Sequence, residues 1–248
     1  MIAVIVQARL GSTRLPGKVL MDIAGYPLIH HVFARLKPST LVNKFILATT
    51  DLPQDDALAE WAAQQGLDCY RGSETDVLDR YYQAAKIFKV DIVVRVTADD
   101  PFKDYRMLDA MLAELETKKK DFISNNNPPS FPEGMDLEIM TFESLQKAAQ
   151  QARDSFEREH VTQYIYRHPE MFKIANFRNQ EGDFSDLRWT LDTEADLTMT
   201  RAVYENLFSS KSLFQYEDIL LLAERKPEIM TINKNQKRSA MYSAKQGN

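Results

Sequence analysis

The sequence predicts an α/β fold in which a mainly parallel sheet carries helices on both faces. Short runs rich in β-branched residues alternate with longer segments of helical period, which is the pattern of repeated strand–helix–strand units. The length of 248 residues suits one large domain, and a hydrophobic content of 44% allows a sizeable core. No internal repeat interrupts this alternation.

Strands and helices alternate regularly through the first hundred residues. The expected strands are Ala3–Gln7, Lys44–Thr49, Leu67–Tyr70 and Asp91–Thr97, and the expected helices between them are Pro27–Leu36, Gln54–Gln65 and Val77–Phe88. Pro27 suits a first helical position, Asp76 can cap the third helix, and Gly66 ends the second. Pro101 cannot donate a backbone hydrogen bond, so it closes the fourth strand.

The second half of the chain has a less regular rhythm. Its expected strands are Phe122–Ser124, Leu137–Phe142, Met171–Phe177 and Leu187–Leu191, and its expected helices are Tyr105–Lys118, Glu143–Ala152, Phe156–Arg167, Glu194–Leu207 and Tyr216–Arg225. Thr193 can cap the helix that begins at Glu194. The residues from Gln236 are polar, so we expect 236–248 to form a disordered tail behind one domain of residues 1–235.

Charge and composition argue against several classes of function. The net charge of −5 disfavours a broad nucleic-acid surface. The single cysteine, Cys69, cannot form an intrachain disulfide and suits a reducing compartment. No basic region precedes the first strand, and no stretch approaches the ~18 apolar residues of a membrane span. We therefore expect a cytoplasmic protein without a membrane partner. Neither a Ser-His-Asp spacing nor a zinc-ligand pattern is found in the sequence.

The stretch QARLGSTRLPGKVL follows the first strand directly and carries three cations, Arg9, Arg14 and Lys18, together with Gly11 and Gly17. A structural turn needs the glycines but not the cations. Ligands of open α/β sheets lie beyond the carboxyl ends of the strands, where backbone amides, arginine and lysine bind phosphate. The two common glycine-rich phosphate motifs are absent. The stretch therefore predicts a triphosphate site, and the alternative is a solvated basic turn.

Two acidic stretches also follow expected strands. Asp99 lies in TADDP, and Asp192 lies in LDTEADL at the start of a helix. Magnesium prefers one or two carboxylates, water and substrate phosphates to a cage made only of protein groups. Asp99 and Asp192 satisfy that preference if the sheet brings them together. The alternatives are a turn aspartate and a helix-capping segment.

From Ala8 to Lys18 every position of the pattern Ala-Arg-x-Gly-Ser-x-Arg-Leu-Pro-Gly-Lys is met, and the sequence resembles the cytidylyltransferases that make CMP-activated acidic sugars. These include CMP-Kdo synthetase, CMP-acylneuraminate synthetase and the spore-coat polysaccharide group. The resemblance implies the Rossmann-like fold of nucleotide-diphospho-sugar transferases. It also implies transfer of a cytidylyl group from CTP to an acidic sugar of the ulosonic type, with release of pyrophosphate, in surface polysaccharide or glycan synthesis.

The resemblance further implies roles for individual residues. Nucleotide contacts would come from Ala8, Arg9, Gly11, Ser12, Arg14, Lys18, Arg71 and Ser73, the catalytic groups would be Arg9, Arg14, Lys18, Asp99 and Asp192, and Asp99 and Asp192 would bind Mg²⁺. Thr50 and Asp51 would border the base and the ribose. Asp79 and Arg80 fit an exposed helix face or an ion pair.

The acceptor side is less well defined by the sequence. Asp136 and Glu138 point to one face, either solvent or an acceptor pocket. His160 is either a surface or capping residue or, by the resemblance, an acceptor contact. A smaller subregion around 122–186 would bind the acceptor and form a homodimer. Two alternatives remain: transfer onto a sugar 1-phosphate from another NTP, and a nucleotide-binding module without turnover.

Overall fold

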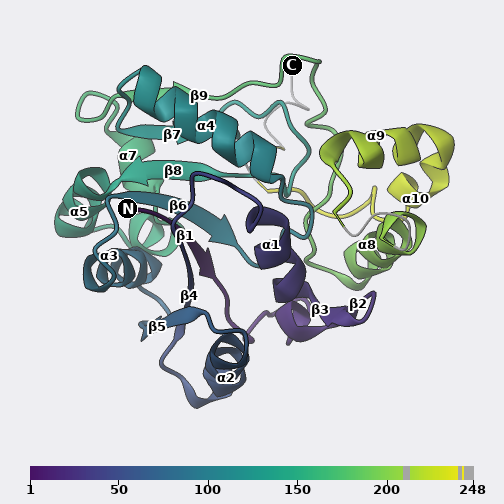
Figure 1. Cartoon of the computed structure of the whole chain (residues 1–248), viewed down its shortest axis with the longest axis horizontal. Coiled ribbons are helices and arrows are strands. Elements are labelled where there is room, and N and C mark those ends of the chain that lie inside the picture. The colour runs from purple at the N-terminus through teal and green to yellow at the C-terminus, as the bar shows by residue number, and fades with distance from the viewer. Residues whose placement is uncertain (209–212, 240–241, 243–248) are drawn as a thin grey trace.

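The centre of the molecule is a sheet whose strands lie in the order β5-β4-β1-β6-β8-β7-β9 (Figure 1). The computed structural model describes residues 1–208, 213–239 and 242. The sheet strands are β1 (Ile2–Gln7), β4 (Lys44–Thr50), β5 (Asp68–Gly72), β6 (Ile92–Thr97), β7 (Phe122–Ser124), β8 (Glu138–Thr141) and β9 (Ile174–Asn176). The neighbours among β5, β4, β1 and β6 are parallel, whereas β8 is antiparallel to both β6 and β7. The predicted mainly parallel sheet is thus confirmed.

Helices cover both faces of this sheet. They are α1 (Leu28–Leu36), α2 (Asp56–Gln64), α3 (Val77–Ile87), α4 (Tyr105–Thr117), α5 (Phe142–Gln151), α6 (Ser155–His160), α7 (Gln163–Arg167), α8 (Glu194–Leu207), α9 (Tyr216–Arg225) and α10 (Pro227–Thr231). One apolar core includes side chains of α1, α2, α4, α8 and α9, and the other includes side chains of α3, α5 and α7. In Figure 1, α8, α9 and α10 gather at one side of the sheet, near a small hairpin of β2 (Asp22–Ile23) and β3 (Tyr26–Pro27).

Strand β1 lies inside the sheet because both of its faces are apolar. Its residues Ala3, Val4, Ile5 and Val6 are completely buried. Val4 and Val6 pack into one core, and Ala3 and Ile5 pack into the other. Such a continuous apolar run is typical of a parallel strand that is covered on both sides. The loop after β1 therefore starts in the middle of the carboxyl edge of the sheet.

The predicted elements of the first half are all present, each within about two residues of its expected ends. The side chain of Asp76 accepts a hydrogen bond from the backbone N–H of Asp79, as a helix cap should. The cap predicted at Thr193 is also present, in a reciprocal arrangement with Asp196. These signals are local in the sequence, so the structure reproduces them.

The single helix predicted over Phe156–Arg167 is wrong. The structure has two helices, α6 and α7, separated at Val161, whose φ is +61°. A β-branched residue rarely adopts this conformation, but Val161 is completely buried in the core that includes side chains of α3, α5 and α7. The break also lets the Thr162 hydroxyl donate to Glu138 at 2.8 Å. Tertiary contacts that the local pattern does not contain thus override the helical period.

The strand predicted at Leu187–Leu191 is also wrong as an element of the sheet. The N–H of Trp189 donates to the carbonyl of Glu133 at 2.7 Å, and the N–H of Leu191 then donates to the carbonyl of Asp99 at 2.8 Å. The segment is extended, but its backbone partner changes after two residues, so only an isolated bridge forms, between Glu133 and Arg188.

The tail predicted to be disordered from Gln236 is in part attached to the domain. Arg238 pairs with the buried carboxylate of Glu133 at 3.0 Å, and the side chain of Tyr242 is buried and donates to Asp136. The polar composition of the tail gave no sign of these acidic partners, which lie more than a hundred residues earlier. Positions 240, 241 and 243–248 lie outside the described residues.

Candidate active site

The loop after β1 folds back on itself and directs its cations toward one cavity. The N–H groups of Ser12 and Gly17 both donate to the carbonyl of Leu10, at 2.8 and 3.0 Å. Gly17 has a φ of +70°, which starts a short 3₁₀ turn at Lys18, and the Leu15 side chain anchors the loop in the core. The loop is thereby held at both ends.

A cavity of about 440 Å³ opens at this edge of the sheet. It is lined by Gln7, Ala8, Arg9, Ser12, Thr13, Arg14, Lys18, Val19, Glu74, Thr75, Val77, Arg80, Arg95, Thr97, Ala98, Asp99, Glu159, His160 and Asp192. The structure therefore brings all five predicted catalytic residues, as well as Ala8 and Ser12, to one cavity. Three other predicted nucleotide contacts are not among the residues that line it.

The ammonium group of Lys18 lies between the two predicted metal ligands. Its Nζ donates to Asp99 Oδ2 at 3.0 Å, to Asp192 Oδ1 at 2.7 Å and to the carbonyl of Leu191 at 2.8 Å. Arg14 Nη2 contacts the same Oδ1 of Asp192 at 2.9 Å. Two carboxylates from segments 93 positions apart in the sequence thus converge on the Lys18 ammonium, and their role as metal ligands stays a prediction.

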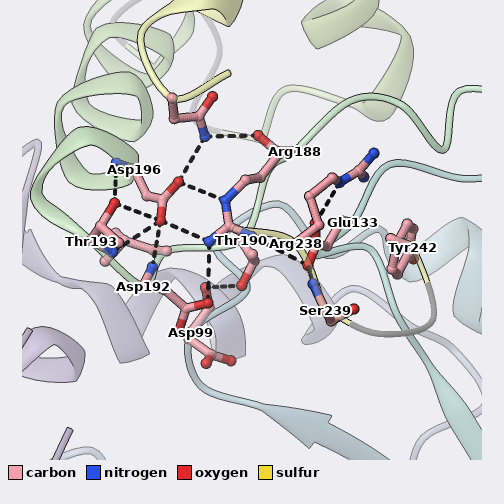
Figure 2. Close-up of polar contacts among 12 residues, drawn as sticks. Asp99, Glu133, Arg188, Thr190, Asp192, Thr193, Asp196, Arg238, Ser239 and Tyr242 are labelled. Atoms are coloured by element: carbon pink, nitrogen blue, oxygen red, sulfur yellow. Dashed lines mark hydrogen bonds and ion pairs between the residues drawn. The ribbon is translucent and has the colours of Figure 1, made fainter. Parts of the chain in front are cut away.

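The position of Asp192 is set by a buried polar cluster that Figure 2 shows in detail. The guanidinium of Arg188 contacts Asp196 at 2.9 Å, Asp192 at 3.2 Å and Glu133 at 3.2 Å. The Asp196 side chain, which is completely buried, also accepts from the backbone N–H of Asp192 at 3.0 Å. Because the guanidinium is planar and rigid, these bonds fix the direction of the Asp192 side chain.

Charge within the cavity keeps the predicted metal ligand Asp99 ionised. Burial works to raise the pKa of Asp99, but the Lys18 ammonium outweighs burial and lowers this pKa to about 2. Burial likewise opposes the charged form of Lys18, and the two carboxylates outweigh it, so the Lys18 pKa lies above its ordinary value. Both groups are therefore charged at neutral pH.

The donor set fits a magnesium ion that also uses substrate oxygens. Asp99 and Asp192 offer two hard oxygen ligands that flank the Lys18 ammonium, so an ion bound by both would lie beside that ammonium. Within residues 1–208, 213–239 and 242, no group of three or more His, Cys, Asp or Glu side chains could hold a metal. Water and phosphate oxygens would have to complete the coordination, which is usual for Mg²⁺.

Gly11, Arg71 and Ser73 have structural contacts outside the cavity lining. Arg71 donates to the carbonyls of Thr50 and Leu52, each at 2.9 Å, and pairs with Asp56. The Ser73 hydroxyl accepts from the N–H of Asp76 at 3.0 Å, directly before α3. A Cβ on Gly11 would lie 3.0 Å from the Gln54 side chain, so this glycine permits a close approach. Their roles as nucleotide contacts stay predictions.

Several cavity residues were not predicted from the sequence. Arg80 is 2% exposed, which corrects its interpretation as part of an exposed helix face. Arg95 and Gln7, which were not predicted, come from the central strands. His160, which the resemblance offered as an acceptor contact, lines the cavity from the end of α6. A usable signal existed for Arg95, because it is a charged residue within the apolar run IVVRVT of β6. Buried strands rarely carry an unexplained charge.

Glu138 faces neither solvent nor the cavity. It is 3% exposed and pairs with Arg95, and it accepts hydrogen bonds from the hydroxyls of Thr162 and Tyr166. Thr50, expected near the base, is completely buried and donates its hydroxyl to Asp55. Glu138 thus holds Arg95, a residue of the cavity wall, from behind.

The chain is similar in sequence and fold to known proteins over most of its length. The profile of the cytidylyltransferase family matches residues 3–244. An uncharacterized protein of Methanocaldococcus jannaschii is 34% identical over 238 residues, which cover 93% of each chain. The spore coat polysaccharide biosynthesis protein SpsF of Bacillus subtilis is 32% identical over 233 residues, covering 92% of this chain and 95% of SpsF.

A further relative and a solved structure are also cytidylyltransferases. The 3-deoxy-manno-octulosonate cytidylyltransferase of Syntrophobacter fumaroxidans is 34% identical over 115 residues, which cover 45% of each chain. A solved cytidylyltransferase structure from Leptospira borgpetersenii superposes with a TM-score of 0.88 at 32% identity, covering 96% of this chain and 98% of the other. No helix of the described residues is long and apolar enough to cross a membrane. The chain therefore belongs to the cytidylyltransferase family of nucleotidyltransferase enzymes.

Proposed function

We propose that this enzyme transfers the cytidylyl group of CTP to an anomeric hydroxyl of an acidic sugar. The observation that carries the proposal is the convergence of Arg9, Arg14 and Lys18 with two carboxylates on one cavity. In the reaction, the sugar oxygen forms a bond to the α-phosphorus, the bond from that phosphorus to the bridging oxygen breaks, and pyrophosphate leaves. The hydroxyl proton passes to solvent.

The cations on the loop after β1 would bind the triphosphate and the leaving pyrophosphate. Arg9 and Arg14 have side chains that are 44% and 54% exposed, so they can turn from Glu74 and Asp192 to phosphate oxygens. Lys18 is nearly buried and fixed by three hydrogen bonds, so it would bind at the inner end of the site formed by the three cations. Mg²⁺ held by Asp99 and Asp192 would neutralise charge that develops on the phosphates. Catalysis would thus depend on positioning and on charge compensation.

The choice of an acidic acceptor draws support from relatives and from the cavity. One relative is named for 3-deoxy-manno-octulosonate, an acidic sugar, and another for spore coat polysaccharide biosynthesis. The cavity extends from the loop after β1 to His160 and Glu159 on α6, which leaves space for a second substrate beside the nucleotide. The preference for cytosine rests on the family.

The proposal is tested by measuring pyrophosphate release with each of the four NTPs against a panel of acidic sugars and sugar 1-phosphates, with Mg²⁺ or with EDTA. We expect release only with CTP, an acidic sugar and Mg²⁺ together. Release with a sugar 1-phosphate and another NTP would replace the proposal with a sugar-phosphate nucleotidyltransferase. Tight CTP binding without release under any condition would indicate a nucleotide-binding module.

A further inference from the structure

Two arginines that face the active-site cavity have guanidinium nitrogens without a partner. Nε of Arg80 and Nε of Arg95 are both buried and lack a hydrogen bond to any residue that the structure describes. Both residues line the same 440 Å³ cavity, Arg80 from α3 and Arg95 from β6. A buried donor without an acceptor costs stability, so such a group in a cavity wall points to a ligand.

Arg80 has no carboxylate partner among the described residues. Its Nη1 donates to the backbone carbonyl of Ser73 at 2.9 Å, and no ion pair involves it in that part of the chain. Its side chain is among the largest fully buried ones. Burial lowers the pKa of Arg80, and the charges of Asp55 and Glu74 act against this without forming an ion pair with it. A buried cation without a direct counter-ion is expensive unless a ligand provides the anion.

Arg95 is held in a fixed direction while one edge stays open. Its Nη1 pairs with Glu138, which is itself fixed by the hydroxyls of Thr162 and Tyr166. The Arg95 guanidinium also lies 5.9 Å from the ring centre of Tyr81. A guanidinium locked on one side by a buried carboxylate presents its remaining donors at a defined place, which suits a planar anion such as a carboxylate.

Arg95 lies on the sheet face that α3 covers, and Arg80 lies on α3 itself. Arg95 is paired in register with Ile5, and Gln7 with Thr97, so all four side chains share the sheet face that α3 covers. The amide oxygen of Gln7 is buried and also lacks a partner among the described residues. The end of α6, with His160, lines this same cavity. This wall of the cavity therefore carries polar atoms that have no hydrogen-bond partner among the described residues.

We propose that Arg80 and Arg95 form the subsite for the carboxylate of the acidic acceptor, and that the Gln7 amide oxygen beside them accepts from a hydroxyl of the same sugar. This inference rests on the proposed function. The triphosphate, with about four negative charges, already has Arg9, Arg14 and Lys18 on the loop after β1. A second anionic group in the same cavity explains why two further arginines face it. The subsite would select acidic sugars over neutral ones.

The test compares an acidic acceptor with its carboxamide, which has the same shape but no charge. The acceptor is the acidic sugar with the highest kcat/KM in the matrix assay. The variants are Arg80→Gln and the double variant Arg95→Gln with Glu138→Gln, which removes the buried ion pair as a unit. Arg225→Gln, an exposed position on α9, serves as the matched control, and a thermal melt verifies folding of each variant.

We expect wild type and control to prefer the acid to the carboxamide, and each variant to raise the acceptor KM roughly 10- to 150-fold, as the loss of a charge-assisted bond predicts. The KM for CTP and the carboxamide rate should stay unchanged. Arg80→Lys, which keeps the charge, should recover part of the preference. A raised KM for CTP instead, or equal losses with acid and carboxamide, would overturn the proposal.

The outcome also separates this inference from the proposed function. If wild type releases no pyrophosphate with any acidic sugar, the proposed function has failed. Calorimetric titration with 3-deoxy-manno-octulosonate then decides about the subsite. Binding to wild type that is lost in Arg80→Gln upholds an anion subsite, whereas no binding, or equal binding to both proteins, overturns it.

Discussion

Replacing Lys18 with Met tests whether its ammonium is the counter-ion of the acidic pair. The distances of 3.0 and 2.7 Å from Nζ place the oxygens of Asp99 and Asp192 no more than about 5.7 Å apart. At an effective dielectric constant of 20, two like charges at this separation repel by ~3 kcal/mol. The Lys18 side chain is only 8% exposed, so water screens the pair poorly. We expect Lys18→Met to lower the free energy of unfolding by ~3–5 kcal/mol at pH 8 in EDTA.

The loss of stability in Lys18→Met should be larger at high pH than at low pH. In wild type, Lys18 lowers the Asp99 pKa to about 2, so the stability from this pair is present above the unfolded pKa. Without the ammonium, the like charge of Asp192 and burial raise the Asp99 pKa in the folded state. The deficit of Lys18→Met should therefore be largest at pH 8 and shrink toward pH 5, where a proton neutralises one acid.

Urea unfolding at pH 5 and pH 8, each in EDTA and in 10 mM Mg²⁺, measures these differences. Mg²⁺ should recover part of the stability of Lys18→Met at pH 8, because it replaces the lost positive charge. Turnover should fall at least about a hundredfold, since a charge on the transferred phosphate is lost. A loss of stability that is equal at both pH values and insensitive to Mg²⁺, or near-normal kcat, would refute the reasoning.

Three further substitutions test the structure around the acids. Gly134→Ala should destabilise the fold by at least ~3 kcal/mol, because φ is +104° and a Cβ would lie 2.5 Å from the backbone nitrogen of Thr190; an unchanged melting temperature would contradict this. Arg188→Met should cost ~3–5 kcal/mol by leaving the buried Asp196 unpaired, and should lower kcat in the protein that still folds; wild-type kcat would exclude the positioning role. Burial raises the pKa of Asp136 to about 7, so wild type should lose up to ~4 kcal/mol relative to Asp136→Asn as pH rises from 4 to 8. Parallel pH profiles of unfolding would refute this third expectation.

Elements with a local cause were predictable from the sequence. The apolar run before Gln7, the cap at Asp76 and the glycine at position 17 each act over a few residues. The three cations next to a strand end predicted a phosphate site, and the structure brings all three to one cavity. The sequence predicted that Asp99 and Asp192 come close to each other only if the sheet brings two strand ends together, because both follow segments expected to be strands.

Features that arise from distant contacts were not predictable. Val161 breaks a regular helical period where it is buried in the core shared with α3, α5 and α7. Arg238 is held by Glu133, and no local signal reveals that partner. Arg80 was expected on an exposed helix face or in an ion pair, whereas the packing of α3 on the sheet buries it. In each case the deciding partner lies on another element.

A crystal structure with CTP and Mg²⁺ tests the central claim most directly. The account predicts the triphosphate along Arg9, Arg14 and Lys18, with the ion bound to oxygens of both Asp99 and Asp192 at ~2.1 Å. Triphosphate in another part of the molecule, or an ion bound away from these two aspartates, would contradict it.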